Sequence, residues 1–561
     1  MDRIGPGRQG AADAMDRYRH DHTNSGRAQM TLARGTRLTR RQFAALSAAG
    51  VATAALPFGG QAIAQTHGGT LTAVFNIEPP HINPGLGTSN VIQTAGGKVF
   101  QGLFNLDENY DVVPVLAERI EVSDDGIEYT FHLRRNVRWH DGEPFTADDV
   151  LFSFEVVPQF HSRTRIALDR VAETIRVDDH TVKLRLNGPY LPFFLATSGV
   201  NMAIIPRHIY EGTDYMSNPA NTAPIGTGPF RFSEWRRGEY IHLVRNEDYV
   251  IDNLPYVDQI FFPMVPDGSQ RSISVETGQT NVIIAGAVNL QDQRRFVDSG
   301  RFRIIEGAYN AIGATIVMNI NMRNPPFDDV RFRRALMHAI NRQQIVDNVF
   351  FGTAQVMEGP ISSATAYFDK SALTLYDYNP QKAIALMDEI GLTPGANGVR
   401  ANFRLIVGQN SANAMRTQEL VRLHLGAVGL NATLVAVDSM PTRDAQWDFD
   451  LLMMIPGQFL DPDIGVSRFY LSSNIVNNFQ ANTGAYENPR VDELWAAATA
   501  ATTVEEAQRH YSEIQRILSE DVPRIWLAEI DQQMLVRNDL QGFGNSPQEG
   551  YAEWDGVHFV S

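Results

Sequence analysis

Two acidic pairs are the residues in this sequence whose type and spacing first suggest chemistry. Asp124-Asp125 and Asp148-Asp149 each place two carboxylates side by side in the chain, and paired carboxylates can act as general acid and base in a hydrolase. The first pair lies in a predicted turn. The second follows Thr146 in a predicted first helical turn, where carboxylates favour the helix dipole. A structural role explains both pairs better. A secreted hydrolase with carboxylate catalysis stays as the alternative, because catalytic carboxylates can lie far apart in sequence.

Other catalytic and cofactor motifs are absent from the sequence. Gly226-Thr227-Gly228 resembles part of a phosphate loop, but it lacks the third glycine, and Pro229 removes a backbone donor. There is no Gly-x-Ser-x-Gly elbow, His-Glu-x-x-His helix or complete P-loop. No histidines after residue 64 have the spacing of metal ligands, and cysteine is absent. We therefore expect no metal, no cofactor and no enzymatic activity.

The bulk composition is that of a soluble globular protein. With 561 residues, the chain is long enough for two or three domains. The hydrophobic content of 43% and charged content of 20% are ordinary. The net charge of −16 argues against a nucleic-acid partner, which requires clustered Lys and Arg.

The first 64 residues have the pattern of an export signal. Arg40-Arg41 is followed by a mild apolar run over residues 44–58, and Ala62-Ile63-Ala64 forms a small-x-small cleavage site. The pattern predicts twin-arginine export to the periplasm, with a mature start at Gln65 and Met30 as an alternative first residue. No cysteine follows the run, so we expect no lipid anchor.

A strand, a turn and a helix are predicted between residues 128 and 155. Apolar residues alternate from Tyr129 to Leu133, which is typical of a half-buried strand. Gly142 and Pro144 favour a turn. Thr146 and Asp149 form a capping box for a helix that we expect to end before Pro158.

Periodicity predicts the remaining elements, and their alternation after Pro325 indicates an α/β lobe with its own core. Strands are predicted at 71–75, 174–177 and 181–186 as a hairpin, 230–235, 240–244, 259–264, 315–320, 402–407, 432–437 and 449–454. Helices are predicted at 91–103, 330–340 with Asp328 as cap, 380–390, 417–428, 491–501 and 505–520. Residues 189–206 are expected to form a buried helix and strand, and 525–542 an extended return.

Three ordered blocks carry a resemblance to a known family. They are Trp139-His140-Asp141-Gly142-Glu143-Pro144-Phe145-Thr146-Ala147-Asp148-Asp149-Val150, then Gly226-Thr227-Gly228-Pro229-Phe230, then the stretch from Asn324 to Arg342. In these blocks the chain resembles the family 5 extracellular solute-binding proteins, the dipeptide- and oligopeptide-binding proteins of ABC importers. The resemblance covers essentially everything after Thr66.

The resemblance implies an α/β fold, namely a two-lobed periplasmic binding protein of the large three-domain, type II-like form with a hinged interlobe cleft. The implied parts are a first-lobe sheet domain (65–112 and 222–322), an inserted domain (113–221), a second lobe (323–534) and a return to the first lobe (535–561). Hinges would lie near 322–326 and 530–537. The implied function is to bind a peptide-like or other polar solute as a monomer and deliver it to a membrane permease and its ATPase.

The cleft of such a protein should be lined from both lobes. On the first lobe we expect ligand contacts from His81, Ser89 and Asn90, and from Tyr309 and Asn310. On the second lobe we expect them from Gln458, Phe459 and Asp461. Plain core packing remains the alternative for Tyr309 and Phe459.

The resemblance also bears on the choice of solute. Peptides, opines, oligosaccharides and metal chelates are all carried on this fold. Peptide-binding relatives commonly hold the ligand's α-ammonium with an aspartate just before an Asp-Pro pair, here Asp461-Pro462, and the matching residue is Gln458. A buried ammonium needs a compensating charge. We therefore expect weak affinity for free di- and tripeptides, with Asp461 or Asp463 as possible substitutes.

Overall fold

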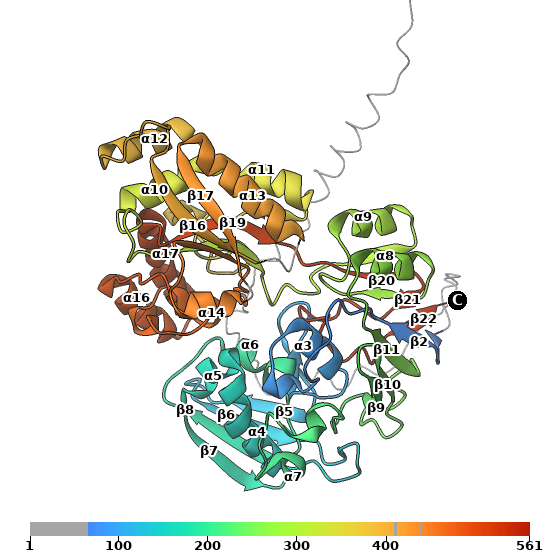
Figure 1. Ribbon diagram of the computed structural model, residues 1–561. Coiled ribbons are helices and arrows are strands. Elements are labelled where there is room, and N and C mark those ends of the chain that lie inside the picture. The colour runs from blue at the N-terminus through green and yellow to red at the C-terminus, as the bar shows by residue number, and fades with distance from the viewer. Residues whose placement is uncertain (1–64, 409–411, 438, 561) are drawn as a thin grey trace, which may run out of the picture. The chain divides into compact units, whose positions relative to one another are not determined.

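The computed structural model describes residues 65–408, 412–437 and 439–560, so the predicted export signal lies outside the described residues (Figure 1). Buried apolar side chains form two clusters, one built mainly from residues 71–309 and 534–557 and the other from residues 316–528. No helix within the described ranges is long and apolar enough to cross a membrane.

The first cluster is surrounded by several small sheets. Their strand orders are β2-β11-β10-β9, β12-β20-β13, β1-β22-β21, β3-β4 and β5-β6-β8-β7. The strands are β1 (Gln65–Thr66), β2 (Thr70–Thr72), β3 (Phe104–Leu106), β4 (Val112–Pro114), β5 (Ala117–Val122), β6 (Glu128–Leu133), β7 (Val171–Asp178), β8 (Thr181–Leu186), β9 (Phe230–Arg236), β10 (Tyr240–Arg245), β11 (Gln259–Pro263), β12 (Val282–Ile283), β13 (Phe302–Ile305), β20 (Met534–Arg537), β21 (Leu540–Gln541) and β22 (His558–Val560). The helices are α3 (Asn90–Gly96), α4 (Ala147–Phe160), α5 (Ser162–Leu168), α6 (Phe193–Thr197), α7 (Arg207–Tyr210), α8 (Gly268–Glu276) and α9 (Leu290–Asp298).

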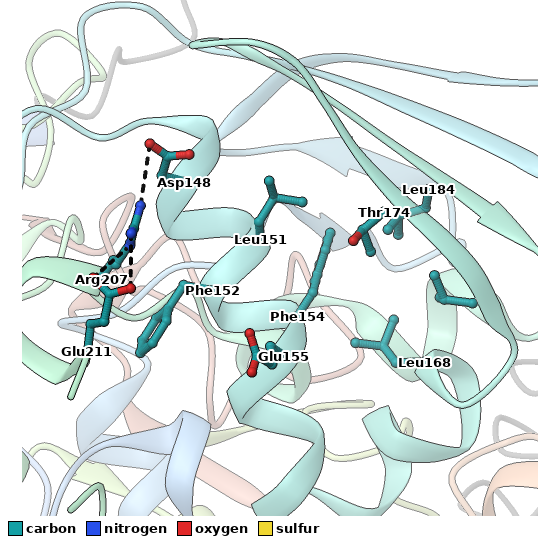
Figure 2. A pocket seen from close by; sticks show the side chains of 11 residues that line it. Asp148, Leu151, Phe152, Phe154, Glu155, Leu168, Thr174, Leu184, Arg207 and Glu211 are labelled. Atoms are coloured by element: carbon teal, nitrogen blue, oxygen red, sulfur yellow. Dashed lines mark hydrogen bonds and ion pairs between the residues drawn. The ribbon is translucent and has the colours of Figure 1, made fainter. Parts of the chain in front are cut away.

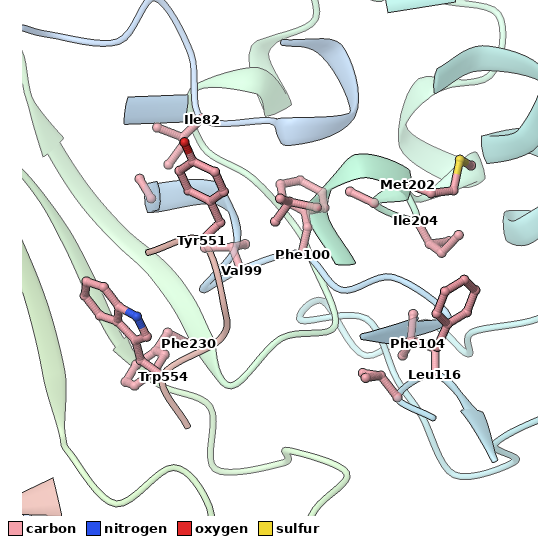
Figure 3. Close-up of a cluster of buried hydrophobic side chains, with 14 of the residues drawn as sticks. Ile82, Val99, Phe100, Phe104, Leu116, Met202, Ile204, Phe230, Tyr551 and Trp554 are labelled. Atoms are coloured by element: carbon pink, nitrogen blue, oxygen red, sulfur yellow. The ribbon is translucent and has the colours of Figure 1, made fainter. Parts of the chain in front are cut away.

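This first cluster joins segments that are far apart in the chain. Figure 3 shows Phe100, Phe104 and Met202 in one buried cluster with Phe230 and with Trp554 from the C-terminal segment. The C-terminal residues therefore complete a core that the N-terminal half begins.

The second cluster lies on a six-stranded mixed sheet of order β15-β19-β14-β18-β16-β17. Its strands are β14 (Thr315–Ile320), β15 (Ala354–Val356), β16 (Ala401–Val407), β17 (Leu430–Ala436), β18 (Leu451–Met454) and β19 (Arg524–Ile530). Its helices are α10 (Val330–Ala339), α11 (Arg342–Phe350), α12 (Pro380–Glu389), α13 (Ala412–Ala427), α14 (Met440–Ala445), α15 (Pro462–Gly465), α16 (Pro489–Thr499) and α17 (Val504–Asp521). β14 is buried at all six positions, because it lies between β19 and β18. This confirms the strand predicted at 315–320.

The strand, turn and helix predicted between residues 128 and 155 are present, and they pack in the first cluster. Alternate residues of β6 are buried, and the Thr146–Asp149 capping box is formed in α4. The prediction that the helix ends before Pro158 is wrong, since α4 continues to Phe160. A proline removes one backbone hydrogen bond and crowds the carbonyl group four residues earlier, but here only two helical residues follow Pro158, so little of the helix is affected.

Most strands and helices lie at or within a few residues of their predicted bounds. Three further predictions are wrong. The helix expected over 91–103 ends at Gly96, and a Cβ on Gly97 would lie 1.9 Å from the Tyr551 carbonyl oxygen, which shows close backbone packing there. Asp329, not Asp328, caps α10. Residues 189–206 contain α6 and a 3-10 turn and no strand.

Candidate ligand-binding site

The loop that follows β18, residues 455–461, contacts the first cluster and borders a cavity there. Phe459 and Ile464 come from this loop and α15, and the cavity is small, with a volume of about 10 Å³, which is about the size of one water molecule. The other lining residues are Arg163, Leu195, Ala196, Asn201, Ala311, Ile312, Gln548 and Tyr551. Ligand sites are typically concave and largely apolar with a few polar groups, and this lining has that character.

The loop backbone is strained and firmly held. Phe459 and Leu460 have φ values of 51° and 58°, in the left-handed region that is unfavourable for residues with side chains. The Gln458 side chain holds the loop, because its Oε1 accepts from Ser362 N at 2.7 Å and its Nε2 donates to Pro360 O at 3.1 Å. Consecutive strained residues persist only where the surroundings fix them, and they cluster at functional sites.

Two buried aspartates follow, Asp461 at the end of this loop and Asp463 in α15. Asp461 Oδ1 accepts from Asp463 N at 2.8 Å and caps α15. Asp463 Oδ2 accepts from Tyr190 Oη at 3.0 Å and lies 3.4 Å from an Arg170 guanidinium nitrogen. Burial, and then the nearby Asp463 charge, raises the pKa of Asp461 to about 7, while burial also raises the pKa of Asp463. These contacts join α15 to the segment between α5 and α6.

Two of the residues expected on the first lobe, Asn90 and Tyr309, contact Tyr551, which lines this cavity. Asn90 Oδ1 accepts from the hydroxyl of Tyr551, a lining residue, at 2.7 Å. Tyr309 is buried with its ring edge-on to Tyr551, and its hydroxyl accepts from Ala285 N at 3.2 Å. Through Tyr551, both residues are one contact away from the cavity.

The remaining expected residues occupy other positions. His81 is buried, and burial lowers its pKa. Ser89 and Asn310 are exposed, and neither lines the cavity. Of the eight expected residues only Phe459 lines the cavity directly, and Gln458 and Asp461 lie in the loop that borders it.

Sequence reasoning missed Arg163, Asn201, Gln548 and Tyr551, which also line the cavity. None of them lies in a recognisable motif. No signal in the sequence could have identified them, because three chain segments that are distant in sequence bring them together.

A larger, open groove with a volume of about 520 Å³ lies elsewhere, beside α4 (Figure 2). Leu151, Phe154 and Leu184 form part of its apolar lining, and Arg207 pairs with Asp148 and Glu211 at one end. The groove shares no residue with the cavity at residues 455–461. Among the described residues, no group of three His, Asp or Glu side chains is placed to hold a metal ion.

Comparison with known proteins gives consistent matches. Residues 111–477 match the family model described as bacterial extracellular solute-binding proteins, family 5 Middle. The glutathione-binding protein GsiB of Salmonella choleraesuis is 27% identical over 82% of this chain and 89% of its own. Heme-binding protein A of Haemophilus influenzae is 28% identical over 80% of this chain and 84% of its own. The crystal structure of NikZ from Campylobacter jejuni in complex with Ni(L-His) has a TM-score of 0.75 at 26% identity, and covers 86% of this chain and 97% of NikZ.

Proposed function

Because the chain belongs to the bacterial extracellular solute-binding proteins of family 5, the substrate-binding components of ABC importers, we propose that it captures a polar or peptide-like solute at the 455–461 loop. It then delivers the solute to a membrane permease driven by an ATPase. The relatives described above are binding proteins, and the comparisons give no support to the alternative of a secreted hydrolase.

The observation that carries this proposal is the cavity whose lining comes from distant segments. Arg163, Ile312, Phe459 and Tyr551 meet around it although they belong to different parts of the chain. A solute there would touch several segments at once. Such contacts allow binding to favour one arrangement of the segments over another.

We also propose the lobes and hinges that such capture requires. The first lobe comprises 65–322 with 535–561, including an inserted domain over 113–221, and the second lobe comprises 323–534. Hinges lie near 322–326 and 530–537, where the chain passes between the two hydrophobic clusters. The Tyr190–Asp463 hydrogen bond joins the lobes, and we expect it to form only when they close. The protein acts as a monomer.

The solute preference follows from the loop. Both polar ends of the Gln458 amide are hydrogen bonded to backbone groups, and Asp463 is engaged by Tyr190 and Arg170. Because they already have partners in the protein, neither the Gln458 amide nor the Asp463 carboxylate is available to bind an α-ammonium group of a solute. We therefore propose a polar solute that lacks a free α-ammonium.

Family members are periplasmic or extracellular, and we propose export by the twin-arginine route, carried by Arg40-Arg41. This signal is read by a receptor and does not anchor the protein. Replacing both arginines with lysine should remove the protein from the periplasmic fraction. Undiminished periplasmic protein would refute this route.

Small-angle scattering of the protein with and without bound solute tests the capture mechanism. We expect a smaller radius of gyration with solute, and chemically intact solute on release. A thermal-shift screen against solute libraries finds the solute, since a ligand of the folded state raises stability. Recovery of many equivalents of a cleaved product would favour the hydrolase, and failure of every solute to bind would refute solute capture.

A further inference from the structure

The segment over residues 546–555, which we call the strap, carries two side chains that line the cavity described above. These side chains are Gln548 and Tyr551. The Tyr551 hydroxyl donates to Asn90 Oδ1 at 2.7 Å, which ties the strap to the start of α3. The position of the strap therefore determines where two of the cavity-lining side chains lie.

A buried lysine contacts the strap next to Tyr551. Lys98 follows α3 closely and is fully buried, which is rare because a charged group loses its hydration on burial. Its Nζ donates to the carbonyl oxygen of Ala552 and lies 3.9 Å from the ring centroid of Trp554. This distance is within the range of cation–π attraction. The ammonium group thus binds the strap within three residues of the tyrosine that lines the cavity.

Two buried glutamates of the strap face this lysine. Glu549 and Glu553 are 3% and 9% exposed, and the charges of both raise the pKa of Lys98. Lys98 makes no ion pair among the described residues, in contrast to Lys183 and Lys370. One ammonium group cannot neutralise two buried carboxylates, so the uncharged arrangement keeps a proton on one of them. We call Lys98, Glu549 and Glu553 the Lys–Glu triad.

The buried triad binds protons differently from an opened strap. Burial raises the pKa of Glu549 to about 7 and that of Glu553 to about 7, against an ordinary value of about 4.3. Between these values the closed strap keeps protons that an opened strap releases, so a rise in pH makes opening easier. Burial lowers the pKa of Lys98 to about 7. Above that pH an opened strap takes up a proton that the closed strap has lost, so the trend reverses.

Three other titratable groups among the described residues face the triad. Asp555 acts on Glu553 through its charge, and burial raises the pKa of Asp555, so it changes the pH dependence in the same direction as the glutamates. Tyr249 donates to Asp555 Oδ2 at 3.1 Å, and Tyr309 lies near Glu549. Burial raises the pKa of both tyrosines, so both keep their protons through neutral pH.

We propose that Lys98, Glu549 and Glu553 are positioning residues that hold the strap through bound protons, so that a rise in pH from acid to neutral loosens it. The released protons pass to the solvent. Because the strap carries Gln548 and Tyr551, the cavity then binds a solute less tightly. The inference rests on the proposed solute-binding function and adds a regulation of that site.

Hydrogen exchange of the ligand-free protein tests the strap without a solute. The amides of Glu549, Tyr551 and Ala552 donate to backbone carbonyl groups, so their protection reports how easily the strap opens. We expect wild-type protection, corrected for the intrinsic exchange rate, to fall about tenfold or more from about pH 5 to pH 7, since each released proton contributes up to tenfold per pH unit. Glu549→Gln cannot ionise there and should roughly halve this fall on a logarithmic scale.

Lys98→Met distinguishes a proton-linked lysine from one that only fills space. The ammonium charge lowers the pKa of both glutamates, so without it they keep their protons to higher pH. The fall in protection should then continue above about pH 7, whereas in the wild type it ends there and reverses. A lysine that only fills space would change protection by the same factor at every pH.

Glu493→Gln is the matched control, because it removes one carboxylate from a side chain that is 67% exposed. The strap of this variant should show the wild-type pH profile. A wild-type profile that is flat between about pH 5 and pH 7, or equal slopes in the wild type and Glu549→Gln, would overturn the inference. Solute capture would still stand in either case, because the exchange measurement involves no solute and the thermal-shift screen tests capture separately.

Discussion

Replacement of Asp461 by asparagine should flatten the pH dependence of stability of the ligand-free protein. The carboxyl has a pKa of about 7 in the folded state, raised by burial and by the Asp463 charge, against an ordinary value near 4 in the unfolded chain. Between these values the folded state keeps a proton that the unfolded state releases, so the free energy of unfolding falls as pH rises. The loss reaches about 1.4 kcal/mol per pH unit, or about 3 kcal/mol from pH 5 to pH 7, as an upper figure.

Asparagine preserves the structure that the aspartate supports. It is an equally good N-cap residue, so the hydrogen bond from Asp463 N that begins α15 can be kept. Urea unfolding of both proteins at several pH values between 5 and 8 measures the difference in slope. Asp298→Asn, at a side chain that is 72% exposed, controls for the loss of one charge. Parallel stability curves for wild type and Asp461→Asn would refute the assignment of a raised pKa to this carboxyl.

Three further predictions concern the loop and its contacts. Tyr190→Phe removes the hydroxyl that donates to Asp463. Calorimetry should show that this variant binds the solute about tenfold or more weakly. Tyr378→Phe changes an exposed tyrosine and should leave the affinity unchanged. Gln458→Ala leaves the buried Ser362 N–H and the Pro360 carbonyl without their partners, so it should lower the free energy of unfolding by about 1–3 kcal/mol. An equal loss in Gln279→Ala, at an exposed glutamine, would contradict this explanation. Calorimetry against mixed free di- and tripeptides should show only weak binding, and submicromolar affinity for any of them would show that our interpretation of Gln458 is wrong.

Local chemistry explains which parts of the fold could be predicted from the sequence. The capping box of α4 depends on Thr146 and Asp149 alone, and the strand β14 on a short, mostly apolar run of residues, so both were predicted correctly. The end of α3 depends instead on the close approach of the Tyr551 backbone to Gly97. A contact between residues so far apart leaves no local pattern.

The candidate site was harder to predict for the same reason. The resemblance directed attention to the correct loop, where Phe459 lines the cavity. The burial of Lys98 could not be foreseen, because a lysine in a sequence carries no sign of what will surround it. Lys98 and Lys370 look alike in the sequence, and only the fold separates them.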